Sequence, residues 1–250
     1  MDSTAGRHGL HVYRSTEHLA RRVAAFAQAG LDRGEPAILV PSREHSEPLL
    51  AELRRRGVDV DARLADGTLI VCDADVNARK CLAASPPSVD GLWRSFLDVM
   101  AGLRARGFRR ITIWGETPDV LRLSGSRALF MDLENRWVEA TRGDEIDLLC
   151  SFRADVLDPS IYEQALPDAC STHTHLIELE DEARVKAADA DLDKALGSRH
   201  YQMLSSLVEQ TPASPAVMPS PLARVLWAAQ HMPTTARRAL QSARVRFPIS

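Results

Sequence analysis

The sequence predicts an α/β fold with three layers, in which helices cover both faces of a mainly parallel sheet, and a C-terminal helical appendage. Short apolar runs typical of buried strands alternate with helical patterns up to Leu179. Apolar residues make up 45% of the 250 residues, which is enough for a full core. Beyond Leu179 the strand-like runs give way to a sequence of helical composition.

Hydrophobic spacing justifies each element in turn. Apolar residues at near-helical spacing over 19–31 predict a first helix, which Gly30 and Gly34 end. The apolar run 37–40 predicts the first strand. The same two patterns then predict a helix over 44–57, a strand at 68–72, a helix over 88–107, a strand at 111–114, a helix over 126–143, a strand at 145–152, a short helix over 159–166 and a last strand at 173–179.

The residues that directly follow the strands are the first candidates for a site. In parallel α/β sheets, ligands bind in the crevice outside the carboxyl ends of the strands. Glu116 is prominent there, because it follows a buried strand and Gly115. The four candidate segments are 41–45, 73–75, 115–117 and 151–153.

A nucleotide hydrolase would need a glycine-rich phosphate loop with a lysine and a hydroxyl after its first strand. The stretch after the first expected strand is VPSREHSEPLL, which has neither glycine nor lysine. Its glutamates, Glu44 and Glu47, would repel phosphate, and its two prolines lack N–H donors. We therefore expect no ATP hydrolysis. No GxSxG, HExxH or dinucleotide glycine motif indicates another enzyme.

Three stretches of the chain carry a resemblance to a known family. The relevant residues are His11, Tyr13, Phe26, Gly30, Leu31, Gly34 and Glu35 in the opening stretch, Gly115, Glu116, Leu133, Glu134 and Trp137 in the middle stretch, and Cys150, Cys170 and His173 near the last strands. In this order and spacing they resemble the MEDS domain, the methanogen/methylotroph DcmR-type sensory domain, over residues 8–178.

The resemblance implies a sensory module with a RecA-like fold that lacks the phosphate loop. It also implies a small organic ligand and a regulatory partner such as a kinase, an anti-sigma factor or a transcription factor. We expect the ligand-binding residues to be His11, Tyr13, Glu116, Glu134 and His173. We expect no catalytic residue, no metal and no cofactor.

Each of these residues also has a purely structural interpretation. Glu116 or Glu134 could form a buried ion pair with an arginine such as Arg153. His11 and His173 could join Glu116 in a zinc or iron site, although no short ligand spacing supports it. His173 and His175 would point to the same face of a strand.

The cysteines and tryptophans are expected mostly in the core. Cys72 and Cys150 lie in or beside apolar strands, where cysteine behaves as a small hydrophobe. Cys170 is expected in a loop and is the better candidate for redox chemistry. Trp93, Trp114 and Trp137 are expected in the core, with Trp114 also forming a wall of the crevice.

The sequence predicts that the chain is divided into four segments. They are a MEDS-like sensory domain over 1–179, a helical extension over 180–210, a proline-rich linker over 211–221 and a basic helical tail over 222–250. From Thr211 onward there is no acidic residue, and five arginines carry the tail's charge. The tail could contact DNA, an anionic membrane or an acidic protein, or be a solvated helix face. Five arginines are few for a DNA-binding domain, so we expect no direct binding to nucleic acid.

The function expected is that of a cytoplasmic sensory or regulatory protein. It would bind a small ligand or a signalling partner in a degenerate nucleotide-type crevice and act on transcription, a sigma factor or a kinase. One alternative is an enzyme that uses Glu116 and His173 as acid–base groups, and another is a scaffold without a ligand. The sequence has no signal peptide and no membrane span, and a homodimer is compatible with it.

Overall fold

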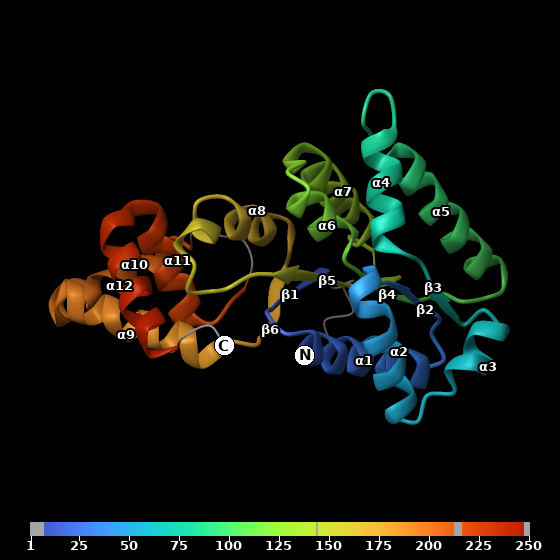
Figure 1. Cartoon of the computed structure of the whole chain (residues 1–250), viewed down its shortest axis with the longest axis horizontal. Coiled ribbons are helices and arrows are strands. Elements are labelled where there is room, and N and C mark those ends of the chain that lie inside the picture. The colour runs from blue at the N-terminus through green and yellow to red at the C-terminus, as the bar shows by residue number, and fades with distance from the viewer. Residues whose placement is uncertain (1–7, 144, 213–216, 248–250) are drawn as a thin grey trace. The chain divides into compact units, whose positions relative to one another are not determined.

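A computed structural model of the chain describes residues 8–143, 145–212 and 217–247 (Figure 1). It consists of two compact units, one formed by Met1–Gly9 and Ser15–Phe152 and the other by Leu10–Arg14 and Arg153–Ser250. The strands are β1 (His8–Tyr13), β2 (Ala37–Val40), β3 (Leu69–Val71), β4 (Ile111–Gly115), β5 (Ile146–Arg153) and β6 (His175–Leu179). Their order is β3-β2-β4-β5-β1-β6 in a parallel six-stranded sheet, which confirms the α/β class.

The first unit has helices on both faces of its part of the sheet. Figure 1 shows α1 and α2 on one face and α4 to α7 on the other. The helices are α1 (Thr16–Asp32), α2 (Arg43–Arg55), α3 (Val60–Ala65), α4 (Ala74–Ala83), α5 (Asp90–Ala105), α6 (Thr117–Leu123) and α7 (Arg127–Ala140). The strands β2 and β4 are buried almost throughout, as continuous apolar runs require.

The strand β1 was not identified from the sequence, and it precedes the strand taken there as the first. In a nucleotide hydrolase the phosphate loop would therefore follow β1 and not β2. Only Arg14 and Ser15 connect β1 to α1, and no glycine or lysine occurs from there to Arg22. Ser15 caps α1, because its side chain accepts a hydrogen bond of 3.2 Å from the His18 backbone N–H.

Three short helices, α3, α4 and α6, were also missed. Each has too few apolar positions to show a helical period. Their local signals are caps: the Asp59 side chain accepts a 3.0 Å hydrogen bond from the Ala62 backbone N–H, and the Asp73 side chain accepts one of 2.9 Å from Val76. The third helix has proline in its first turn, where a missing N–H costs nothing.

The helix α1 lies close to β4 at one glycine. A methyl group on Gly30 would overlap the Thr112 hydroxyl and lie 2.7 Å from the Thr112 Cβ. The Thr112 hydroxyl donates a 3.0 Å hydrogen bond to Glu35, which also receives two hydrogen bonds from Arg33. Burial raises the pKa of Glu35, but hydrogen bonds from Arg33 and Thr112 outweigh it and lower that pKa below its usual value.

The second unit is mostly a helical bundle. It contains the 3-10 helix η1 (Pro159–Tyr162), α8 (Ala165–Thr172), α9 (Glu182–Leu196), α10 (Ser198–Gln210), α11 (Ser220–His231) and α12 (Pro233–Arg246). Gly197 separates α9 from α10 with a positive φ of 73°. The apolar core of the bundle consists of Leu192, Leu204, Val208, Ala228, Ala236 and Ala239.

The arginines of the expected basic tail are largely paired within this unit. Arg246 donates hydrogen bonds of 3.0 and 2.7 Å to Asp191, whose pKa is lowered by this contact despite burial. Arg224 binds Asp189 at 2.9 Å. Further ion pairs join Arg244 to Asp155 and Arg237 to Glu163. Arg237, Arg244 and Arg246 keep 38–57% of their side chains exposed, so α12 has a solvated basic face whose arginines also pair with acidic neighbours.

Part of the expected linker is also bound to the second unit. Val217 pairs with His175 in an isolated parallel bridge, in which the Leu176 N–H donates to the Val217 carbonyl at 2.8 Å. The helix α11 begins soon after, at Ser220. Residues 213–216 of the linker lie outside the described ranges.

Candidate functional site

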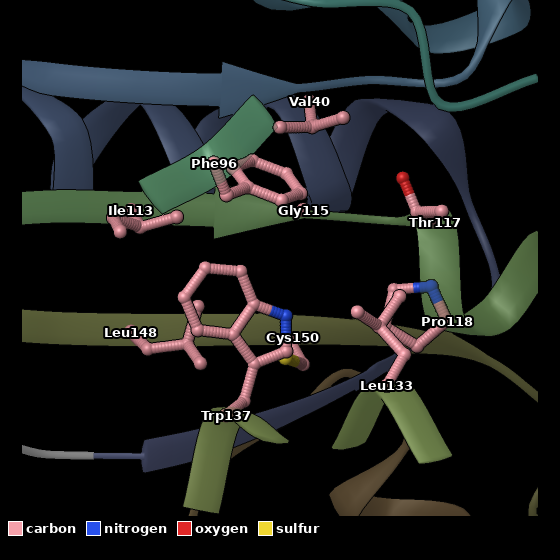
Figure 2. Close-up of a pocket in the computed structure, with 10 residues that line it drawn as sticks. All are labelled: Val40, Phe96, Ile113, Gly115, Thr117, Pro118, Leu133, Trp137, Leu148 and Cys150. Carbon is pink, nitrogen blue, oxygen red and sulfur yellow. The ribbon is translucent and has the colours of Figure 1, made fainter. Parts of the chain in front are cut away.

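A small pocket lies at the carboxyl ends of β2, β4 and β5 in the first unit (Figure 2). Val40, Gly115 and Cys150 come from these strand ends, at the edge where the sequence analysis expected a site. We call it the strand-end pocket, and it is lined by Val40, Phe96, Ile113, Gly115, Thr117, Pro118, Leu133, Trp137, Leu148 and Cys150. Its cavity is about 10 Å³, close to the space that one water molecule needs.

Aromatic rings from two helices close one side of the strand-end pocket. Phe96 of α5 and Trp137 of α7 meet edge to face with their ring centres 5.2 Å apart. Trp93 packs against Trp137 in the same way at 4.9 Å. Trp114, the expected wall of the crevice, is instead fully buried, and its indole N–H donates a 2.8 Å hydrogen bond to Ser151. The tryptophan that lines the pocket is Trp137.

Thr117 is the polar group of the pocket that has no partner. Its side chain is 2% exposed, and its hydroxyl forms no hydrogen bond with any residue that the structure describes. Figure 2 shows the hydroxyl on the side of Val40. A buried hydroxyl without a hydrogen bond costs about 1–3 kcal/mol. This position therefore suits a bound molecule that can hydrogen-bond to it.

Glu116 lies beside the strand-end pocket and holds the turn between β2 and α2. Its carboxylate accepts a 2.8 Å hydrogen bond from the Ser42 backbone N–H. The same carboxylate lies 2.8 Å from Nδ1 of His45, so a proton on Nδ1 would complete a second hydrogen bond. Both side chains are buried. Since Val40 lines the pocket two residues before Ser42, this pair fixes one wall of the pocket.

A second polar cluster surrounds Cys150, which lies within β5. Nε2 of His8 is 3.3 Å from Oε2 of Glu134 on α7 and 3.4 Å from Sγ of Cys150. All three residues are 4% exposed or less. Burial, followed by the charge of Glu134, raises the pKa of the Cys150 thiol well above its usual value. Cys150 is buried, as the sequence analysis expected, and it belongs to both this cluster and the strand-end pocket.

The five predicted ligand-binding residues fall in different units. Glu116 and Glu134 belong to the first unit, near the pocket. In the second unit, the rings of His11 and Tyr13 stack with centres 5.8 Å apart. His173 follows α8, and its Nδ1 lies 2.6 Å from the Ala169 carbonyl oxygen, the geometry of a donated hydrogen bond. No observation tests the ligand-binding role of these residues, which stays a prediction.

Two details of the sequence analysis were wrong in the second unit. The strand β6 begins at His175, so His173 lies before the strand and the alternation argument for the two histidines fails. Cys170 is fully buried within α8, where its neighbours are core residues, and it does not lie in a loop. An exposed thiol suited to redox sensing is therefore absent at this position.

Only some of the residues in these polar clusters could be identified from the sequence. His45 was inside a segment chosen for inspection, 41–45, although its pairing with Glu116 was not foreseen. The candidate segment 115–117 likewise included Thr117. His8 was missed because β1 was missed. The sequence around Glu134 on α7 does not indicate which histidine it contacts in the fold.

The structure is a parallel α/β sheet with a small pocket and buried polar pairs beside its strand ends, the edge at which α/β proteins commonly bind ligands. The family model of MEDS, the MEthanogen/methylotroph, DcmR Sensory domain, matches residues 7–174, which is more than half of the chain. The chain belongs to this family, as its motifs predicted, and has a sensory or regulatory role. No curated protein sequence matches it. Within the described ranges, no helix is long and apolar enough to cross a membrane.

Proposed function

We propose that this chain is a sensory regulator whose first unit binds a small organic ligand in the strand-end pocket. The bound state would pass to a regulatory protein partner that acts on transcription, a sigma factor or a kinase. Membership of a sensory-domain family supports the general role. The observation that carries the proposal is the buried Thr117 hydroxyl, which lines the pocket and has no partner among the described residues.

The lining of the pocket indicates the chemistry of the ligand. Most of its walls are aliphatic or aromatic, including Phe96, Leu133 and Trp137, and Thr117 supplies one hydroxyl. Such a pocket favours an apolar body with a single polar group, because each extra polar group would be buried without a partner. Small alcohols, ketones and phenols fit this description.

The small size of the pocket supports a sensing role. A cavity of about 10 Å³ holds no more than a water-sized group, so a larger ligand binds only if the walls move. Trp137 and Thr117 belong to two different helices, α7 and α6, which would have to shift. A ligand that binds only the open form changes the balance between two conformations, as a switch requires.

The proposal includes no catalysis. Glu116 is the strongest acid–base candidate, but its carboxylate is already engaged by Ser42 and His45 and serves to position the turn. The rival function is an acid–base enzyme. The sequence analysis paired Glu116 with His173 for this role, whereas the imidazole that Glu116 contacts is that of His45. Turnover of a bound compound that is lost in both Glu116→Gln and His45→Gln would favour the rival.

The direct test is binding of a panel of small alcohols, ketones and phenols to the purified full chain. Isothermal titration calorimetry would measure affinity, and thermal unfolding would measure stabilisation. We expect at least one compound to bind, and Thr117→Val to weaken it about fivefold to tenfold through loss of one hydrogen bond. No binding across the panel, or equal affinity in the variant, would contradict the proposal.

Thr112→Val is the matched control for Thr117→Val. Both threonines are at least 98% buried, but the Thr112 hydroxyl donates to Glu35 whereas the Thr117 hydroxyl has no described partner. Thr117→Val should therefore keep or raise the free energy of unfolding, by up to about 1 kcal/mol. Thr112→Val should lower it by about 1–3 kcal/mol and leave ligand binding unchanged, since Thr112 does not line the pocket.

A further inference from the structure

We propose that His8, Glu134 and Cys150 form a binding site for a divalent transition metal such as Zn²⁺. This inference goes beyond the ligand pocket and replaces the sequence-based expectation that the chain binds no metal. The three side chains belong to β1, α7 and β5, and all lie in the first unit. Their donor atoms, Nε2, a carboxylate oxygen and Sγ, lie within 4.8 Å of one another.

The spacing of the donors fits a metal site. Bonds of 2.0–2.3 Å in a tetrahedron place neighbouring donor atoms roughly 3.3–3.8 Å apart. The observed distances from His8 Nε2 are 3.3 Å to Glu134 and 3.4 Å to Cys150. The third distance, between the Glu134 carboxylate and Cys150 Sγ, is no more than 4.8 Å, so the three donors could close around one ion.

The chemical types of the donors narrow the choice of metal. Imidazole, thiolate and carboxylate together suit zinc and its spectroscopic substitute cobalt, whereas calcium and magnesium prefer oxygen donors alone. When the metal binds, the Cys150 thiol loses its proton to solvent and the sulfur forms the bond to the metal. The incoming cation then offsets the charge of the buried carboxylate and thiolate, which would otherwise be costly to bury.

A tetrahedral zinc site takes four donors, and these side chains supply three of them. Cys150 also lines the strand-end pocket, where Figure 2 shows its sulfur among the lining side chains. The proposed metal site and the pocket therefore share a residue. The metal site does not depend on the ligand hypothesis, because its test uses the metal alone.

The test is a titration of chelator-treated full-length protein with Co²⁺, followed by absorption spectroscopy. We expect an equimolar complex with a near-ultraviolet band from sulfur-to-cobalt charge transfer, and displacement of Co²⁺ by Zn²⁺. Cys150→Ser should abolish that band. Cys81→Ser is the matched control, because Cys81 is another buried free cysteine but belongs to no such donor group in the described ranges, and it should keep the band.

Glu134→Gln gives a second variant if Cys150→Ser fails to fold. It retains size and hydrogen bonding but loses a charged donor. Its Co²⁺ affinity should fall more than the roughly 10–100-fold that loss of an outer partner costs. A wild-type protein without the charge-transfer band, a band that persists in Cys150→Ser, or unchanged affinity in Glu134→Gln would each overturn the proposal and leave a hydrogen-bonded cluster.

Discussion

Three buried glutamates of the first unit have different partners, and these partners differ in whether they can change protonation or bind a metal. Glu35 is bound by Arg33 and by the Thr112 hydroxyl, a combination that stabilises a fixed negative charge. Glu116 is bound by an imidazole and a backbone N–H, and Glu134 lies beside an imidazole and a thiol. Arginine stays protonated at physiological pH, whereas imidazole and thiol groups can change their protonation state or bind a metal.

The role assigned to Glu35 predicts a dependence of stability on pH. Its pKa is lower in the folded chain than in the unfolded chain, so its stabilisation is present above the unfolded pKa, about 4.3. That stabilisation is lost as pH falls through the folded pKa. Glu35→Gln should lower the free energy of unfolding by about 1–2 kcal/mol at pH 7, and this difference should shrink below about pH 4.

Urea unfolding at pH 7 and at pH 3 would measure both quantities. Glu145→Gln is the control, because the ion pair of Glu145 with Arg104 is solvent-exposed at both ends. Exposed pairs contribute little, so this variant should change stability at pH 7 by less than about 0.5 kcal/mol. A Glu35→Gln variant that is as stable as wild type at pH 7 would refute the structural role.

The sequence could identify those residues of the site that directly follow a strand. Glu116 was identified because it follows an apolar run, and that placement holds in the structure. Its partner His45 follows another strand, so the two meet only because β2 and β4 are neighbours in the sheet. In the second polar cluster, His8 meets Glu134 and Cys150, which are both more than 120 positions away along the chain, a relation that no local pattern encodes.

At the scale of elements, the packing of α1 on β4 depends on Gly30. Gly30→Ala should lower the free energy of unfolding by about 1–3 kcal/mol, because the new methyl group would overlap the Thr112 side chain. Gly102→Ala is the matched control in α5, since a methyl group there meets no atom within 4 Å. It should raise the free energy of unfolding by about 0.5–1 kcal/mol through helix propensity.

Chemical denaturation of both variants at neutral pH would check this pair. Equal stability of the two variants would mean that α1 moves away from β4 at little cost.

Element prediction itself succeeded where apolar runs were long enough, as for β2, β4 and α5. It failed for β1, in which two histidines interrupt the apolar pattern although the whole strand is buried.

At the scale of the whole molecule, the C-terminal residues form part of a packed unit. Leu222 and Leu226 of α11 and Leu240 of α12 are fully or almost fully buried. Deletion of residues 211–250 would uncover the apolar face of α9, which contacts both helices. The domain boundaries expected at 179, 210 and 221 stay a prediction. The two compact units divide after Phe152.

The deletion of residues 211–250 should therefore destabilise the second unit. We expect strong binding of the dye ANS and a broad thermal transition, both of which report exposed apolar surface and lost packing. Arg238→Gln is the control, because it removes charge from an exposed position and leaves both helices in place. A truncated chain that neither binds ANS nor loses its cooperative transition would show that the tail is a separable appendage.

The bridge between His175 and Val217 has a mechanical consequence. A flexible linker lets the elements at its two ends move independently, whereas a segment that is hydrogen-bonded to a strand moves with that strand. Val217 is hydrogen-bonded on both sides to the chain around β6, and α11 starts three residues later. A displacement of β6 would thus reach α11 through only the few residues between Val217 and Ser220.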